Sequence, residues 1–389
     1  MQTAPRALLM GFPHGIIVAD KMKILVLTES LGLGGAETMA VALANALSLT
    51  DGIEVVFSSA AGPLQNRLSS NIKYYPIQKF SFSAIVSVLR QITEIVNNAG
   101  PDIIHAHGAT VGILAGFVAR RMDKRIKIVL THHSKTFSRI PEWLSILLIK
   151  RYCDFFVAIS KAKMRNLIAL GIPPEKLMFV PNFLDSILIC DLLKASTREK
   201  TREKLNIPLD SIVLVMAGRL LPQKRFDKFI KITELFANKT DNPVYGLILG
   251  DGDERFRLEK LAKELSRGAQ IQFLGYQKNV FEFLAASDVF LFPSHHEVLP
   301  MALLEACAVG LPIVCSNIAG NDEIVENGGN GFLIDGGDND YCDAVSKIIN
   351  DTALATKMKQ NARTLVLERF DKRKVLNSLV SLYTILARN

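Results

Sequence analysis

The sequence is poor in cysteine and holds no long uninterrupted apolar stretch. Its 389 residues include five cysteines, an odd number without a C-x-x-C pair, which excludes a disulfide scaffold and favours reduced thiols in a cytoplasmic protein. No apolar run reaches the roughly 18 residues of a membrane-spanning helix. Pro13 and His14 interrupt an apolar patch near the start, so residues 1–22 are predicted to be an N-terminal extension and not a secretory signal.

Internal repeats and low-complexity tracts are also missing, which excludes a solenoid and a disordered chain. The composition is 49% hydrophobic and 22% charged, which is typical of a globular protein. At roughly 100 to 200 residues per domain, the length predicts about two domains.

Basic residues exceed acidic ones, and the excess lies in the first half of the chain. Residues 1–196 hold 21 Lys+Arg and 13 Asp+Glu. Part of this excess forms a cluster of Arg120, Arg121, Lys124, Arg125 and Lys127. The cluster is either a solvated helix face or a surface attracted to an anionic membrane or an acidic substrate. Nucleic acid is not expected as a partner, because no stacking aromatics are interleaved with the basic residues.

Short apolar, β-branched runs alternate with longer helix-like segments along the chain. This alternation is typical of parallel sheets joined by helices, and it predicts an α/β fold with two doubly wound domains. The predicted strands are 24–27, 54–58, 102–105, 128–131, 155–159, 213–217, 245–249, 271–274, 289–292, 313–315 and 332–334. A polar stretch at 194–210 separates residues 23–196 from residues 197–370. Because ligands bind beyond the carboxyl ends of such strands, a substrate is expected in a cleft between the domains.

Three glycines, Gly32, Gly34 and Gly35, follow the first predicted strand and precede a helix-like segment. Glycine at this position lets backbone N–H groups approach a phosphate at a helix N-terminus. The same residues also fit a tight turn between a strand and a helix. A nicotinamide cofactor is disfavoured, because the spacing is not G-x-G-x-x-G and no acidic residue ends the second strand in a ribose-binding position.

Two basic residues follow the first strand of the second domain. Arg219 comes directly after this strand, and Lys224 lies five residues later in a loop that leads to a helix. Such a pair can hold a diphosphate, the arginine through its planar fork and the lysine as a point charge. Either residue can equally be a surface charge.

Two glutamates flank the predicted start of a helix at Pro300. Glu297 lies in the loop after the strand at 289–292, and Glu305 lies within the helix, where its neighbours are apolar. Carboxylates at two depths of one cleft can accept hydrogen bonds from separate sugar hydroxyls. Glu305 requires a partner, because it is a charge among residues suited to burial.

These motifs together resemble the retaining, nucleotide-sugar-dependent glycosyltransferases of family 4, which have the GT-B fold of two facing Rossmann-like domains. The resemblance rests on the two-glutamate segment, on GGAE at 34–37, on GRLLPQK at 218–224 and on LGDGDER at 249–255. It covers the chain from residue 23 to about residue 383. By this resemblance, residues 371–389 form a helix that packs back toward the first domain.

The resemblance implies a role for each charged residue of these motifs. Glu305 would bind the ribose of the nucleotide, and Glu297 would contact the hydroxyls of the transferred sugar. Arg219 and Lys224 would hold the diphosphate and stabilise it as it leaves. His133, which follows the strand at 128–131, would be the cleft histidine near the anomeric carbon.

The backbone at several positions would complete the donor site by the same resemblance. Leu299, Pro300 and Met301 would face the diphosphate from the second domain, and Gly34 and Gly35 would do so from the first. Val298 stands where the family commonly has glycine, which affects the shape of this loop.

No metal or other cofactor is expected. His105 and His107 share one face of a strand end, where they form either a metal site or, as we favour, a structural pair. His295 and His296 lie beside Glu297 without a second cluster at ligand spacing, and the family needs no ion to bind its donor.

The sequence is therefore interpreted as a hexosyltransferase that moves a sugar from a nucleoside diphosphate to a hydroxyl acceptor with retention at the anomeric carbon. The expected acceptor is a lipid-linked glycan or a cell-surface polysaccharide precursor, such as lipopolysaccharide. The expected location is the cytoplasm, with peripheral attachment to the inner face of an anionic membrane. A nucleotide-sugar epimerase of the same fold and a non-catalytic nucleotide-sugar-binding protein stay as alternatives. The base, the sugar and the oligomeric state stay open.

Overall fold

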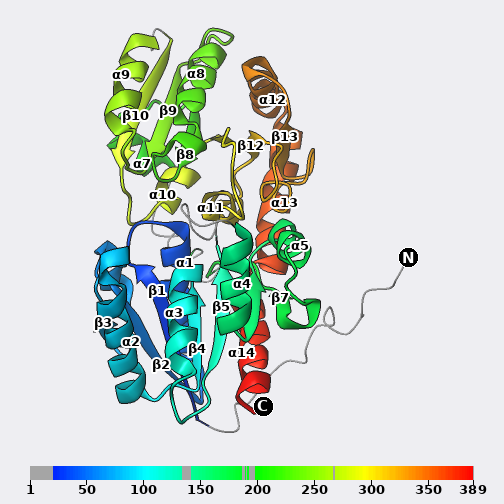
Figure 1. Cartoon of the computed structure of the whole chain (residues 1–389). Helices are drawn as coiled ribbons and strands as arrows, with labels where there is room; N and C mark the ends of the chain where they lie inside the picture. Colours follow the sequence, from blue (N-terminus) through cyan, green and yellow to red (C-terminus); the bar gives the residue numbers. More distant parts are fainter. Residues whose placement is uncertain are drawn as a thin grey trace. The chain divides into compact units, whose positions relative to one another are not determined.

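The structure is a computed structural model that describes residues 21–133, 142–185, 189, 191, 198–265 and 268–388. The chain divides into two compact units. Unit 1 comprises Met1–Asn182 and Lys372–Asn389, and unit 2 comprises Phe183–Asp371. Each unit has a parallel sheet with helices packed on it (Figure 1). The predicted α/β fold with two Rossmann-like, doubly wound domains is thereby confirmed.

The sheet of unit 1 has the strand order β3-β2-β1-β4-β5-β6-β7, with every pairing parallel. Its strands are β1 Met22–Ser30, β2 Ile53–Ala60, β3 Lys73–Pro76, β4 Ile103–His107, β5 Lys127–His132, β6 Phe155–Ala158 and β7 Leu177–Phe179. The chain order reverses at β1, which lies between β2 and β4 and pairs Thr28 with His107 at its carboxyl end. This topological switch point is where ligands bind in open α/β sheets.

Helices α2, α3 and α4 lie side by side over one face of this sheet (Figure 1). They bury one apolar core with the strands, which includes Val88 of α2, Val111 of α3 and Ile149 of α4. Helix α1 packs on β1 and β2 and also contacts α14. The helices of unit 1 are α1 Gly35–Leu47, α2 Ile85–Ala99, α3 Ala109–Ala119, α4 Glu142–Tyr152, α5 Lys161–Ala169 and α14 Lys372–Arg388, with 3-10 turns at Pro63–Arg67, Phe82–Ala84 and Pro174–Lys176.

The sheet of unit 2 has the order β10-β9-β8-β11-β12-β13, again with every pairing parallel. Its strands are β8 Ile212–Ala217, β9 Val244–Leu249, β10 Ala269–Gly275, β11 Val289–Phe292, β12 Ile313–Ser316 and β13 Gly331–Ile334. The chain order reverses between β8 and β11, so the switch point of this sheet lies there.

The helices of unit 2 pack on its sheet and on one another, with α8 against α9 and α12, and α11 against α10 and α13. They are α7 Arg198–Lys204, α8 Phe226–Ala237, α9 Arg255–Leu265, α10 Phe281–Ala285, α11 Met301–Val309, α12 Asp338–Asn350 and α13 Thr352–Arg369, with a 3-10 turn η5 at Pro222–Lys224. Arg202 of α7 is completely buried, where its guanidinium donates to Asp288 and to the carbonyl oxygens of Ala286 and Ser211. This network fixes α7 against the start of β8 and β11.

Every strand that the sequence predicts is present, but β3 and β7 were not predicted. Both are short strands at an edge of the unit 1 sheet, and β3 ends in Pro76 with both of its ends exposed. An edge strand pairs on one side only and buries less apolar surface than a central strand. Strand β3 holds two tyrosines between Lys73 and Pro76, and β7 is an apolar run of only three residues, so each carries a short strand signal.

The unit boundaries differ from the predicted segment limits. The first strand begins at Met22, whose backbone N–H donates to the Gly52 carbonyl oxygen, so residue 22 belongs to the sheet and not to the extension. Residues 1–20 lie outside the described part of the chain. Unit 2 begins at Phe183 and not at residue 197, because the Leu184 N–H bonds to the Phe370 carbonyl and Leu184 pairs with Asp371. Helix α14 belongs to unit 1.

Within the described residues, none of the helices combines the length and the apolar character that crossing a membrane requires.

Candidate functional site

Two loops of unit 2 leave the sheet at its switch point. The loop after β8 runs from Gly218 into the turn η5, and the loop after β11 runs from Pro293 to Pro300. Because β8 and β11 are neighbouring parallel strands, their carboxyl ends meet at one edge of the sheet. Both loops carry the charged residues that the sequence singles out.

The Lys224 ammonium and the Glu297 carboxylate form a direct ion pair in these loops. The Lys224 Nζ atom lies 2.7 Å from Glu297 Oε1 and 2.8 Å from Oε2. The Ser294 hydroxyl donates to the same Oε1 at 2.7 Å. The Glu297 side chain is 7% exposed and that of Lys224 is 21% exposed. The pair is therefore largely shielded from water, and each partner fixes the other.

The Arg219 side chain is exposed, and none of the described residues forms an ion pair or hydrogen bond with it. Its guanidinium therefore keeps its hydrogen-bond donors available in the loop that also carries Lys224. Glu305 lies on α11 and is partly buried. The structure thus joins Lys224 directly to Glu297 and places Arg219 and Glu305 on the elements that follow β8 and β11.

Glycines let neighbouring loops come into backbone contact beside this pair. A Cβ atom at Gly250, whose φ is +138°, would lie 1.9 Å from the Gly218 carbonyl oxygen. A Cβ atom at Gly252 would lie 2.5 Å from the Leu220 carbonyl oxygen. At Gly320, with φ +94°, it would lie 2.5 Å from the Val298 carbonyl oxygen. At the carboxyl edge, the loops after β8 and β9 therefore hold each other in place, as do the loops after β11 and β12, through close backbone packing that a side chain would prevent.

Helix α11 begins one residue after the predicted start, with Pro300 as the N-cap residue and Met301 as its first residue. Leu299 and Pro300 are buried, and Met301 is partly exposed. Helix α11 has no acidic residue in its first turn. The partial positive charge of this helix N-terminus therefore lies three residues beyond Glu297, at the end of the same loop.

In unit 1, Gly34 is the N-cap residue of α1 and Gly35 its first residue. The Glu37 carboxylate lies over this turn, since a Cβ atom at Gly34 would be 2.2 Å from Glu37 Oε2. The negative charge of Glu37 would repel an anion that approached the backbone N–H groups of this turn. Glu37 belongs to the GGAE motif, yet the sequence analysis gave it no role.

The predicted cleft histidine, His133, directly follows β5 and is partly buried. Its Nε2 atom lies 2.9 Å from Nδ1 of His107, which ends β4. His132 is buried, as expected for the neighbour of a residue that faces the other way at a strand end. His105 and His107 do stack as a pair, with ring centroids 4.6 Å apart.

Among the described residues, no group of three or more His, Cys, Asp or Glu side chains is arranged to hold a metal ion. His295 and His296 are exposed beside Glu297. The two side chains of β4 instead bond within the protein, His105 to Thr131 Oγ1 at 2.6 Å and His107 to His133.

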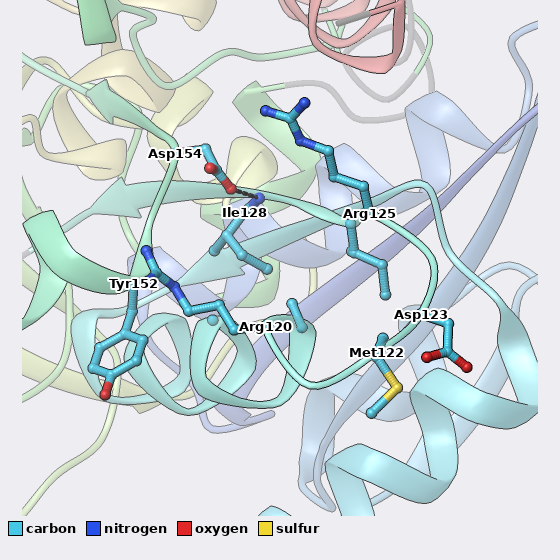
Figure 2. Close-up of a pocket in the computed structure, with 10 residues that line it drawn as sticks. Arg120, Met122, Asp123, Arg125, Ile128, Tyr152 and Asp154 are labelled. Atoms are coloured by element: carbon cyan, nitrogen blue, oxygen red, sulfur yellow. Dashed lines mark hydrogen bonds between the residues drawn. The ribbon is translucent and has the colours of Figure 1, made fainter.

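A pocket of about 340 Å³ lies at the opposite, amino end of the unit 1 sheet, between the end of α3 and the starts of β5 and β6. Figure 2 shows Arg120 beside Tyr152, and Asp154 accepting a hydrogen bond from the Ile128 N–H. The Arg120 guanidinium also donates to the Arg151 carbonyl oxygen. Since ligands of this fold bind at the carboxyl ends of the strands, the pocket is separate from the candidate site.

Three residues that hold the candidate side chains in place were not predicted from the sequence. Ser294 has the hydroxyl that bonds to Glu297, and its position two residues after β11 was the available signal. Thr131 and Tyr383 bond to the two ring nitrogens of His105. Tyr383 lies 278 residues from His105 in the sequence, and no local pattern connects them.

The chain is similar to known glycosyltransferases over most of its length. Residues 33–186 match the family described as Glycosyltransferase Family 4, and residues 197–365 match the one described as Glycosyl transferases group 1. UDP-Gal:alpha-D-GlcNAc-diphosphoundecaprenol alpha-1,3-galactosyltransferase of Escherichia coli is 28% identical over 340 residues, which cover 83% of this chain and 86% of that protein. N-acetyl-alpha-D-glucosaminyl L-malate synthase of Bacillus anthracis is 26% identical over 345 residues, which cover 85% and 89%.

A solved structure shares the fold over nearly the whole chain. The Anabaena protein HepE in complex with UDP-glucose superposes with a TM-score of 0.78 at 22% identity, covering 94% of this chain and 100% of that one. The likeness extends across both units and identifies their fold as GT-B. With both units matched to glycosyltransferase families, and with the charged motifs of the second unit at its switch point, the chain belongs to the family 4 glycosyltransferases.

Proposed function

We propose that this glycosyltransferase binds a nucleoside diphosphate sugar at the carboxyl edge of the unit 2 sheet and transfers the sugar to a hydroxyl group of a glycan or lipid-linked acceptor. The observation that carries the proposal is the Lys224–Glu297 ion pair at the switch point, in the same loops as the exposed Arg219. The HepE structure contains UDP-glucose, which supports a donor of this class.

The charges of the two loops suit the chemistry of such a donor. When the nucleoside diphosphate departs, negative charge grows on its phosphate oxygens, and fixed cations at that position stabilise the transition state. Arg219 and Lys224 supply these cations. Glu297 accepts hydrogen bonds from sugar hydroxyls, and Glu305 from the ribose. His133 of unit 1 contributes a ring N–H near the reacting carbon.

Retention at the anomeric carbon is part of the proposal. In this chemistry the acceptor hydroxyl attacks the face that the leaving group vacates, and a phosphate oxygen takes its proton. Glu297 already binds Lys224 and Ser294, which suits a binding residue better than a nucleophile. The anomeric proton coupling of the product distinguishes retention from inversion, and an inverted product would contradict this part of the proposal.

Donor binding is expected to stabilise the protein against thermal unfolding. A ligand at about 100 times its dissociation constant adds roughly 2.7 kcal/mol to the free energy of unfolding. We expect one of UDP, GDP, ADP and dTDP to raise the melting temperature, and NAD to leave it unchanged. A shift with NAD alone would favour an oxidoreductase and would overturn the proposed donor class.

Arg219→Ala is the sharpest variant for this measurement. Because the Arg219 side chain is exposed and forms no ion pair or hydrogen bond with the described residues, its removal should keep the melting temperature of the unliganded protein while reducing the rise in melting temperature that the nucleotide causes. Lys263→Ala is the matched control, since Lys263 is an exposed cation on α9 of the same unit. If the nucleotide raised the melting temperature of both variants equally, Arg219 would not be part of the donor site.

We also propose that the protein works at the cytoplasmic face of an anionic membrane. The acceptor in the name of the E. coli relative is a diphosphoundecaprenol-linked sugar, which supports a lipid-linked substrate. Arg120, Arg121, Lys124 and Arg125 are exposed near the amino end of β5. Each basic residue near an anionic surface contributes about 1 kcal/mol of attraction. The four cysteines in the described part of the chain are free and buried, which suits a reducing compartment.

Membrane binding is expected to depend on these charges. The protein should sediment with vesicles that contain phosphatidylglycerol and not with pure phosphatidylcholine vesicles. Replacing Arg121 and Arg125 by glutamine should weaken binding by about 2 kcal/mol, or roughly 30-fold. Replacing the exposed Lys260 and Lys263 of α9 by glutamine is the control with the same loss of charge. Equal binding to both kinds of vesicle would exclude an electrostatic contribution.

A further inference from the structure

Three histidines form a continuous stack at the carboxyl edge of the unit 1 sheet. The rings of His105 and His107 are stacked with centroids 4.6 Å apart, and those of His107 and His133 with centroids 5.2 Å apart. The Tyr383 hydroxyl, from α14, bonds to His105 Nδ1, and the Thr131 hydroxyl bonds to His105 Nε2. His133, which has a proposed role in transfer, therefore lies at the end of a fixed chain of side chains.

The stack is uncharged at neutral pH. Burial lowers the pKa of His105 to about 3 and that of His133 to about 4, and it lowers the pKa of His107 well below its ordinary value. The charge of a neighbouring histidine lowers the pKa values of His105 and His107 further. Each ring therefore carries one N–H and one bare nitrogen, and the hydrogen bonds decide which nitrogen is protonated.

Only two arrangements of protons fit the bond between His107 Nδ1 and His133 Nε2. In the first, His107 donates from Nδ1, its Nε2 is bare, and His133 carries its proton on Nδ1. In the second, His133 donates from Nε2, and His107 carries its proton on Nε2. The His107 Nε2 atom is buried and bonds to no described residue.

The burial of His107 Nε2 decides between these arrangements. The second arrangement would bury an N–H donor without an acceptor among the described residues, and buried N–H groups without a partner are rarer in proteins than acceptors without one. The first arrangement leaves a bare ring nitrogen at that point, where the stacked rings pack. The first arrangement is therefore the more stable one, and in it His133 Nδ1 carries the proton and can donate a hydrogen bond.

We propose that His107 is a positioning residue for transfer, which holds His133 in the tautomer protonated on Nδ1. In this tautomer, neutral His133 presents an N–H to its ligand and not a lone pair. Sugar hydroxyl and phosphate oxygens accept hydrogen bonds, so this tautomer is the one that can bind them. This inference rests on the role of His133 in the proposed function, but the tautomer itself does not.

Nitrogen-15 NMR of histidine-labelled protein tests the tautomer without any substrate. Protonated and bare ring nitrogens have distinct chemical shifts, and loss of a signal pair in His133→Gln assigns His133. We expect the wild-type protein to show His133 protonated on Nδ1 and bare at Nε2. The opposite pattern, or a charged ring at neutral pH, would overturn the proposal.

Variants of His107 test its effect on His133. His107→Phe keeps a stacking ring but removes the donor, so His133 should lose its preference for Nδ1 protonation. His107→Asn keeps an N–H close to the position of Nδ1 and should restore the preference. His105→Phe is the matched control, because His105 also stacks on His107 but has no hydrogen bond to His133 among the bonds that the structure shows. An unchanged His133 tautomer in His107→Phe would contradict the proposal.

Transfer rates connect the tautomer to function. We expect His107→Phe to lower kcat/KM by roughly 10- to 100-fold, by analogy with the range found when the hydrogen-bond partner of a metal-ligating histidine is removed. His107→Asn should recover part of this loss. If the wild-type protein binds no nucleoside diphosphate, the proposed function fails. If it transfers sugar and His107→Phe shifts the tautomer without slowing transfer, the positioning role fails.

Discussion

Acidification to about pH 5 is expected to destabilise unit 1 by several kcal/mol. Burial lowers the pKa values of His105 and His132 to about 3, and the Lys163 charge adds to this effect at His132. Their pKa in the unfolded chain is about 6.5. Below that pH the unfolded chain binds protons that the folded chain does not, so stability falls as the pH falls. Each of these histidines should lower the free energy of unfolding by about 2 kcal/mol at about pH 5.

Fluorescence of the single tryptophan provides the measurement, because Trp143 lies in α4 of unit 1. Urea unfolding would be followed between about pH 7.5 and pH 5. His105→Gln should be less stable at neutral pH but lose about 2 kcal/mol less on acidification. Thr131→Val removes a hydrogen-bond partner of His105 without removing a titrating group. Its free energy of unfolding should therefore fall on acidification by as much as that of the wild type. An equal decline in His105→Gln and the wild type would show that His105 is not the source.

The central strands and the start of α11 could be predicted from sequence because their signals are local. A strand such as β8 is buried along its whole length and reads as a continuous apolar run. Pro300 marks a helix start by its fixed backbone angle. The edge strand β3 was missed because Lys73 and Pro76 interrupt its apolar run, and β7 because its run has only three residues. Met22 was missed because the hydrogen bond from its N–H to Gly52 cannot be inferred from the sequence.

The contacts of the candidate site depend on topology, which the sequence motifs do not specify. Lys224 and Glu297 were each predicted, but their ion pair joins residues 73 positions apart and follows from β8 lying next to β11. The bond from Tyr383 to His105 depends in the same way on where α14 packs. The contact between the Glu37 carboxylate and the Gly34 turn is local in sequence. It was missed because the glycines were considered as a phosphate-binding turn, without regard to the acidic residue beside them.

Replacing Lys224 by alanine is expected to lower kcat/KM by about 100-fold. The substitution removes a preorganised cation from the position where the leaving diphosphate gains charge, and losses of this kind are on the order of 10² to 10³. It also leaves Glu297, which is 7% exposed, with the Ser294 hydroxyl as its remaining partner shown by the structure. An unpaired carboxylate in this position should reduce the free energy of unfolding by roughly 1 to 3 kcal/mol. Steady-state transfer assays and calorimetry measure the two effects separately.

The chain offers a control that separates chemistry from stability. Lys228 of α8 is 19% exposed and pairs with Asp338 at 3.5 Å, so Lys228→Ala removes a lysine of similar burial from an ion pair with a more exposed partner in the same unit. It should lower stability but not transfer. The double variant of Lys224→Ala with Glu297→Gln should regain stability, because no charge is left unpaired, while its transfer stays low because the cation is still missing. If the double variant recovered transfer together with stability, Lys224 would serve only to hold the loop, and Arg219 would be the cation that stabilises the diphosphate.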